Sequence, residues 1–196
     1  MNKRHCQISL LNICLIVVVS FLTSLILGGA LYKIPNHEKI EFFISTGYVD
    51  EDYFINKIAV NDKIRKINIV SRSISNDYYE EALQTIGVFS DLLIIPAKYL
   101  DTTDEAFSFA VIDYQLFRDN NIQYGNLDLI IHENKCYGIV VYDKEQNINL
   151  FKDYLVFEDD QKYVLCVGKS TPNAYMNPTG KKQTSNALTS FIELIK

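Results

Sequence analysis

The sequence predicts an α/β fold, in which a transmembrane helix is followed by a single three-layer domain with a mostly parallel sheet and a late β-hairpin. Three observations support this prediction. The first 32 residues contain a long apolar segment, residues 39–96 alternate between strand-like and helix-like patterns, and two later strand patterns are separated by a short polar turn. Such alternation is typical of parallel strands that are covered by helices.

The N-terminal segment is mostly apolar and has no Asp, Glu, Lys or Arg between Arg4 and Lys33. A helix needs roughly 20 apolar residues to cross the hydrocarbon core of a membrane. Lys3 and Arg4 precede the segment, and basic residues tend to stay on the cytoplasmic side. We therefore expect residues 1–32 to form a cytoplasmic stub and a signal-anchor helix, which holds the protein in the cell membrane by a single pass with its N-terminus cytoplasmic.

A cleaved signal peptide is the alternative for this segment. Gly28, Gly29 and Ala30 are small residues of the kind found at cleavage sites, so a signal peptidase could cut near Ala30. The apolar segment is longer than the roughly 7–15 residues of a usual signal core, which favours the anchor. Under both interpretations residues 33–38 form a linker and residues 39–196 form an extracytoplasmic domain.

The chain after residue 32 has the composition of a folded, acidic domain. It holds all 24 acidic residues and 17 of the 19 basic ones, so its formal net charge is −7. Its length is sufficient to bury a hydrophobic core. Because nucleic-acid binding depends on neutralising phosphates, we expect no nucleic-acid partner.

Strand-like and helix-like patterns alternate in the first half of this domain. The run at 91–96 is continuously apolar, as in a strand that is covered on both faces. Acidic residues at 50–52 and Asn76 are suited to helix N-termini. We therefore expect, in chain order, a strand at 40–45, a helix at 50–61, a strand at 67–70, a helix at 76–87 and a strand at 91–96.

The second half predicts a hairpin, a further strand and a final helix. Residues 128–132 and 136–142 are strand-like and flank a polar turn at 133–135. Residues 98–126 are ambiguous, because a helix could begin at Asp101 or a strand could cover 107–111. We expect the remaining elements to be a strand at 163–168, a loop at 169–183 and an amphipathic helix at 184–195 with Leu188, Phe191, Ile192 and Ile195 facing inward.

No catalytic or metal-binding motif is present. The sequence lacks a P-loop, a GxGxxG pattern and a GxSxG pattern, so we expect neither an enzyme nor a cofactor. No Cys/His spacing predicts a metal site. Cys136 and Cys166 lie in the part expected outside the cytoplasm, where they could form a disulfide or remain two buried thiols.

The best candidate for a ligand site is the edge where the parallel strands end. Ligands of open α/β sheets bind beyond the carboxyl ends of the strands. Hydroxyls, a guanidinium and helix N-termini could hold an anionic or zwitterionic group there. The alternative is that these are ordinary turn and capping residues. The candidates are Ser45, Thr46 and Tyr48 after the first strand, and Ser71, Arg72 and Ser73 after the second.

Several short segments resemble a known family. They are the start of the first strand at 39–45, SDLLIIP at 90–96, YGIVVY at 137–142 and KYVLCVGKS at 162–170. Together they are similar to the extracellular solute-binding proteins of ABC transporters, which have the type II periplasmic-binding fold. The resemblance implies a non-enzymatic domain that binds a small solute or a transporter-like membrane protein.

The chain departs from that family in size. Only about 20 residues separate the YGIVVY and KYVLCVGKS segments, where a second lobe would normally be inserted. We therefore expect one lobe, without a ligand cleft between two lobes. The alternative function is a structural or interaction subunit of a membrane complex without a small-molecule ligand, and an exposed apolar patch in place of a polar pocket would favour it.

Overall fold

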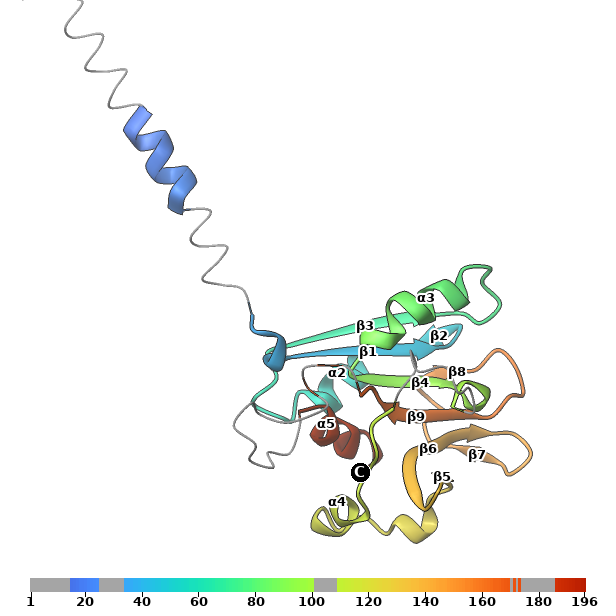
Figure 1. Ribbon diagram of the computed structural model, residues 1–196. Helices are drawn as coiled ribbons and strands as arrows, with labels where there is room; N and C mark the ends of the chain where they lie inside the picture. Colours follow the sequence, from blue (N-terminus) through green and yellow to red (C-terminus); the bar gives the residue numbers. More distant parts are fainter. Residues whose placement is uncertain (1–14, 25–33, 101–108, 170, 172, 174–185) are drawn as a thin grey trace, which may run out of the picture. The chain divides into compact units, whose positions relative to one another are not determined.

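The computed structural model describes residues 15–24, 34–100, 109–169, 171, 173 and 186–196 (Figure 1). The chain divides into two compact units, Met1–Pro35 and Asn36–Lys196. In the first unit, residues 15–24 are helical. The Thr23 hydroxyl lies 2.9 Å from the carbonyl oxygens of Val19 and Ser20, so this polar group bonds back to its own helix. Among the described residues, no helix has both the length and the apolar character needed to span a membrane. Most of the signal-anchor helix predicted at 1–32 lies outside the described residues.

The first half of the domain contains the predicted alternation of strands and helices. The second unit begins at Asn36, so residues 36–38, which were predicted as linker, belong to the domain. Asp50 caps the first helix by accepting a hydrogen bond from the Tyr53 amide. The elements are η1 (Asn36–Glu38), β1 (Lys39–Ser45), β2 (Tyr48–Val49), α2 (Glu51–Ile58), β3 (Lys66–Arg72), α3 (Tyr79–Thr85), η2 (Gly87–Phe89), β4 (Leu92–Pro96) and η3 (Ala97–Tyr99).

The second half confirms the predicted hairpin and resolves part of the ambiguous region. The hairpin turn is made by Glu133 and Asn134, which both have positive φ. The helix of the ambiguous region begins after Asp113, while residues 101–108 lie outside the described part of the chain. The elements are α4 (Tyr114–Asp119), η4 (Tyr124–Asn126), β5 (Leu129–His132), β6 (Lys135–Asp143), β7 (Ile148–Asn149), β8 (Leu155–Val156), β9 (Tyr163–Val167) and α5 (Asn186–Ile195).

One mixed sheet forms the centre of the domain, which confirms the α/β class. Its strand order is β3-β1-β4-β9-β6-β5, and β7 pairs with β6. The pairs β1–β3 and β1–β4 are parallel, whereas β4–β9, β9–β6 and β6–β5 are antiparallel. A separate antiparallel ribbon joins β2 to β8. The parallel strands therefore lie together in one half of the sheet.

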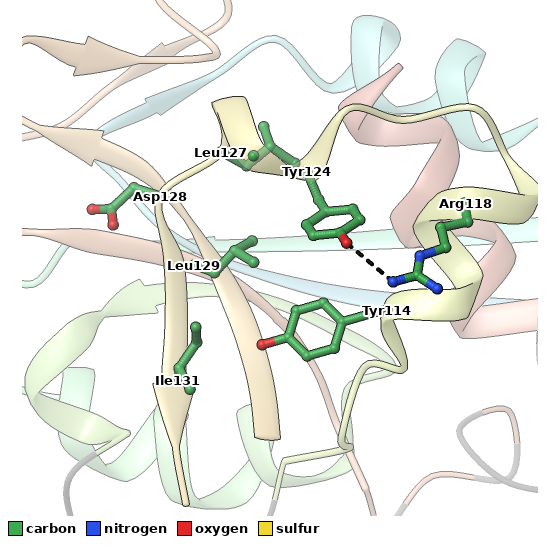
Figure 2. Close-up of a pocket in the computed structure, with 8 residues that line it drawn as sticks. Tyr114, Arg118, Tyr124, Leu127, Asp128, Leu129 and Ile131 are labelled. Atoms are coloured by element: carbon green, nitrogen blue, oxygen red, sulfur yellow. Dashed lines mark hydrogen bonds between the residues drawn. The ribbon is translucent and has the colours of Figure 1, made fainter. Parts of the chain in front are cut away.

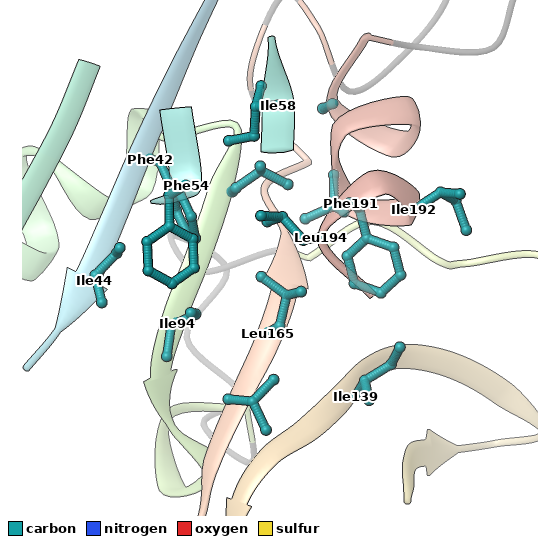
Figure 3. Close-up of a cluster of buried hydrophobic side chains, with 14 of the residues drawn as sticks. Phe42, Ile44, Phe54, Ile58, Ile94, Ile139, Leu165, Phe191, Ile192 and Leu194 are labelled. Carbon is teal, nitrogen blue, oxygen red and sulfur yellow. The ribbon is translucent and has the colours of Figure 1, made fainter. Parts of the chain in front are cut away.

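Two hydrophobic clusters lie on opposite faces of this sheet and give the domain its three layers. Alternate residues of each strand enter alternate clusters, as the pleat requires. In β4, Ile94 belongs to the cluster that includes α2 and α5, while Leu93 belongs to the cluster that includes α3. Figure 3 shows the first cluster, in which Phe54 and Phe191 from the two helices pack over the strands.

The helices occupy opposite faces because the chain reverses direction across the sheet. It passes from β1 outward to β3 through α2, and then back across β1 to β4 through α3. Crossovers of the same hand that run in opposite directions place their helices on opposite faces. Asn76 was predicted to cap the second helix, but α3 begins at Tyr79 and the Asn76 side chain accepts from the Tyr78 amide in the preceding turn.

Candidate functional site

The structure brings the predicted ligand residues together at the carboxyl ends of β1 and β3. The parallel register places Ser45 opposite Arg72 and Ile44 opposite Ser71. The Thr46 amide continues the pairing by donating to the Arg72 carbonyl at 3.0 Å. The predicted assembly at this edge of the sheet is therefore present.

The polar groups at this edge are already engaged within the domain. The Ser45 hydroxyl lies 2.6 Å from the Tyr79 hydroxyl, and both groups are buried. The Thr46 hydroxyl lies 2.6 Å from the Val156 carbonyl oxygen. The Arg72 guanidinium donates to its neighbouring Ser71 carbonyl at 2.8 Å. These contacts fit the turn-and-cap interpretation of the edge.

Residues 151–158 place part of the chain next to this edge. The amides of Gly47 and Asp50 donate to the carbonyls of Val156 and Tyr154, at 3.3 Å and 2.9 Å. The Tyr154 ring stacks on Tyr53 of α2 with centroids 3.5 Å apart. This segment lies between the YGIVVY and KYVLCVGKS strands, where a two-lobed protein would carry its second lobe.

Glu158, in the same segment, places a carboxylate at the edge. It accepts a hydrogen bond from the Ser73 hydroxyl. A Cβ atom built on Gly47 would lie 2.5 Å from the Glu158 Oε1, so this carboxylate also sits against the turn after β1. The position proposed for an external anion therefore holds an acidic side chain of the domain itself.

The strand order places the topological switch point between β1 and β4, and tyrosines fill it. Tyr79 is buried between Phe43 and Tyr99, with ring centroids 6.3 Å and 6.1 Å away. Burial raises the pKa of the Tyr79 phenol, and the Ser45 hydrogen bond opposes this only in part. Because the phenol stays protonated, the hydrogen bond between the Tyr79 and Ser45 hydroxyls joins two neutral groups. The ligand position usual for open α/β sheets is thus filled by the core.

Comparisons of the chain with protein-family models, curated proteins and solved structures find no match. The resemblance to solute-binding proteins therefore stays a prediction.

A pocket lies at the other end of the sheet, between α4, η4 and the edge strand β5. Its volume is about 520 Å³, within the range of roughly 300–1,000 Å³ that is usual for small-molecule sites. Figure 2 shows the Tyr114 and Tyr124 rings on one side and Leu129 and Ile131 of β5 on the other. Most of the lining is therefore apolar, and the residues that line the pocket are Tyr114, Arg118, Tyr124, Gly125, Leu127, Asp128, Leu129 and Ile131.

The aromatic wall of this pocket is fixed to the core. The Tyr114 and Tyr124 ring centroids are 5.5 Å apart. Behind them, Phe117 is fully buried. Its ring centroid lies 5.9 Å from that of Tyr124 and 6.4 Å from that of Phe191 of α5. Asp113 holds the start of α4 by accepting from the Gln115 amide at 2.8 Å. The two tyrosines are therefore held in place by packing against the hydrophobic core.

The two charged residues of the pocket have different surroundings. Asp128 lies 3.5 Å from the Lys162 ammonium, which also lies 3.0 Å from Asp143 and lowers the pKa of that buried carboxyl. Arg118 donates to the Tyr124 hydroxyl at 3.3 Å. None of the ion pairs among the described residues includes Arg118. One lysine is therefore shared by two carboxylates, Asp128 and Asp143. The pKa of Arg118 is raised by its hydrogen bond to Tyr124 and by the nearby Asp113 carboxylate, although Arg118 forms no ion pair with a described carboxylate.

Sequence reasoning missed this pocket because its residues come from three separate segments. Tyr114 and Arg118 are four residues apart and share a helix face, while Leu129 and Ile131 are two apart on a strand. Both spacings are visible in the sequence. Their proximity depends on the pairing of β5 with β6 and on the position of α4, which the ambiguous region did not predict.

The cysteines do not form the disulfide considered from the sequence. Both are free and buried. Cys136 belongs to the cluster on one face of the sheet and Cys166 to the cluster on the other, so their side chains point apart. Burial raises the pKa of both thiols. In the part of the chain that the structure describes, no group of three His, Cys, Asp or Glu side chains could hold a metal ion.

Proposed function

We propose that this protein is a membrane-anchored, extracytoplasmic binding domain of solute-binding type that acts without catalysis. Its small solute would occupy the pocket between α4 and β5. The observation that carries this proposal is the pocket itself, which is concave, mostly apolar and bounded by few polar groups, as ligand sites usually are. The apolar N-terminal segment supports the membrane anchor.

The surroundings of three buried nucleophiles, Ser45, Cys136 and Cys166, fit binding without catalysis. A catalytic serine needs a neighbouring base. The Ser45 hydroxyl meets the Tyr79 phenol, whose raised pKa keeps it protonated. The Cys136 and Cys166 thiols also have raised pKa values, so both stay in the unreactive protonated form.

A second function, docking to a membrane protein, is favoured by an apolar pair on the β2–β8 ribbon. Tyr48 and Val156 lie opposite each other in that ribbon and are 58% and 56% exposed. They stand near the edge whose hydroxyls are already engaged. In this alternative the domain would be an accessory subunit, and the α4–β5 pocket would have no solute.

Filling the pocket tests the leading function. A Cβ atom added to Gly125 would meet no heavy atom within 4 Å, so Gly125→Leu places a side chain at the pocket without a clash at Cβ. We expect members of a library of small fluorinated aromatic compounds to show broadened ¹⁹F signals with the full chain in lipid nanodiscs. These effects should disappear with Gly125→Leu, while the melting temperature stays unchanged.

The matched control is Val60→Leu, which alters a side chain on the domain surface that is 68% exposed. It should bind the same compounds as the natural chain. If the library binds equally to the natural chain and to Gly125→Leu, or does not bind at all, solute binding in this pocket is wrong and the docking function is favoured.

A further inference from the structure

We infer that the α4–β5 pocket selects an amphipathic organic anion, with an apolar or aromatic body and one carboxylate or similar acidic group. This inference rests on the proposed solute-binding function and adds the class of solute. It follows from the charge at the pocket, from the hydrogen-bond donors at Tyr124 and from the shape of the apolar walls.

The charges at the pocket favour a negative ligand group. Lys162 lies 3.5 Å from Asp128 and 3.0 Å from Asp143, so one ammonium group is shared by two carboxylates. Arg118 forms no ion pair among those of the described residues, and its bond to Tyr124 joins it to a neutral group. The hydrogen bond to Tyr124 and the nearby Asp113 carboxylate raise the pKa of Arg118, so the guanidinium is charged. A ligand acidic group would therefore be favoured at the Arg118 side of the pocket, away from Asp128 (Figure 2).

Arg118 and Tyr124 together offer donors for an acidic group. The Tyr124 oxygen accepts a hydrogen bond from the Arg118 Nη2 at 3.3 Å. The phenol therefore keeps its own O–H available to donate, and the guanidinium keeps further N–H groups. Figure 2 shows these two groups at the same side of the pocket. Hydrogen bonds from a charged donor to a carboxylate are stronger than neutral ones.

The remaining walls suit an apolar body of limited thickness. The Tyr114 and Tyr124 rings are inclined by 46° to each other, and they face Leu129 and Ile131 across the pocket. Ile131 is 55% exposed, so covering its side chain would remove apolar surface from water. An aromatic ring could pack between the tyrosines and β5 while its acidic group reaches Arg118.

The test compares each of several small fluorinated aromatic carboxylates with its own carboxamide, such as 4-fluorocinnamate with 4-fluorocinnamamide. Dissociation constants are measured by ligand-observed ¹⁹F NMR on the full chain in nanodiscs of uncharged lipid. We expect the carboxylates to bind about 5- to 10-fold more tightly than the carboxamides, the scale of one charge-assisted hydrogen bond weakened by solvent.

Four variants assign the preference to particular groups. Arg118→Gln should remove the preference for carboxylates, because it should weaken the binding of the carboxylates and leave that of the carboxamides unchanged. Tyr124→Phe keeps the ring and should reduce the preference by a smaller factor. Gly125→Leu should abolish binding of both members of each pair. Arg72→Gln removes the exposed guanidinium at the carboxyl ends of β1 and β3. It should change the affinity for neither the carboxylates nor the carboxamides.

The outcomes separate the class of solute from the binding function. If carboxamides bind as tightly as carboxylates, and Gly125→Leu blocks both, solute binding stands and the anion preference is wrong. A preference that Arg72→Gln removes, but Arg118→Gln does not, also overturns the inference. If Gly125→Leu affects no compound, both the inference and the solute-binding function fail.

Discussion

Asp91 is a buried carboxyl group that joins distant parts of the domain. Its Oδ2 accepts from the Glu41 amide at 2.8 Å and from the Asn173 side-chain amide at 3.2 Å. That same amide nitrogen also donates to the Lys39 carbonyl at 2.7 Å. The Thr171 hydroxyl is near enough to lower the pKa of Asp91 in part, yet neither it nor the Asp91 Oδ1 has a hydrogen-bond partner of good geometry. Burial outweighs these contacts and raises the pKa of Asp91.

Asp91→Asn should therefore stabilise the domain at neutral pH. A raised folded-state pKa means that Asp91 favours folding at pH values below its unfolded pKa, and that this contribution is lost as pH rises through the folded pKa. The asparagine keeps an acceptor for Glu41 and can donate its new N–H₂ toward Thr171. We expect the free energy of unfolding to rise by about 1 kcal/mol at pH 7, the scale of one satisfied buried polar group.

Urea unfolding of the full chain in nanodiscs, followed by circular dichroism at several pH values, measures this effect. The difference from the natural chain should shrink as pH falls from the raised folded-state pKa of Asp91 to its unfolded-state pKa, and it should stay constant at lower pH. Asp62→Asn, at an exposed position, is the matched control and should have little effect. A loss of stability with Asp91→Asn at pH 7 would show that the ionised carboxylate is required.

At the scale of elements, the β5–β6 turn holds backbone strain that a substitution can relieve. Glu133 and Asn134 have φ values of 49° and 61°, as in the type I′ turns that suit two-residue hairpins. Asparagine tolerates this region better than glutamate does. We expect Glu133→Asn to raise the free energy of unfolding by about 0.5–1 kcal/mol and β-branched Glu133→Val to lower it by about 1 kcal/mol. Urea midpoints measure both changes.

The control for the turn is Lys135→Asn, at the next residue, whose φ is not positive. It should change the midpoint little, because Lys135 is exposed at the first position of β6. The contact between His132 and Glu133 is 4.0 Å long and exposed, so its loss should cost almost nothing. Equal effects of all three substitutions would mean that the turn conformation does not limit stability.

The elements that could be predicted are those whose pattern is local. The apolar run at β4, the acidic start of α2 and the polar turn between β5 and β6 all depend on neighbouring residues. The antiparallel entry of β9 beside β4 depends on contacts about 70 residues apart, which no local pattern encodes. The six-residue helix α4 carries too short an apolar stripe to be distinguished from a strand.

The candidate site was predictable in its assembly and not in its surroundings. The parallel order of the first strands implied that Ser45 and Arg72 would meet, and they are register partners. The sequence did not show that Glu158 and its neighbours would reach the same edge, because no local pattern around Glu158 specifies its packing partner. The pocket between α4 and β5 was missed for a related reason, since its residues are brought together by tertiary packing alone.

At the scale of the whole molecule, the segment between β7 and β9 limits where a ligand site can lie. Tyr154 and Val156 of this segment pack on α2 and on the turn after β1. Without this segment, the Thr46 hydroxyl and the Gly47 amide would lose the Val156 carbonyl as a hydrogen-bond partner. This packing explains why the edge is engaged, and it favours a site elsewhere in the domain.

The membrane anchor predicted from the sequence concerns the whole molecule, and Val18→Asp tests it. One aspartate at the centre of a spanning helix costs about 3 kcal/mol on insertion scales, so this variant should lose much of its membrane retention after an alkaline carbonate wash. Val60→Asp places the same charge on the exposed domain surface and should stay in the membrane fraction. Protease added to intact cells should digest residues 36–196 of the natural chain. A mature protein that begins near residue 31 would establish the cleaved signal instead, and a chain that stays cytosolic and protected from protease would contradict both topologies.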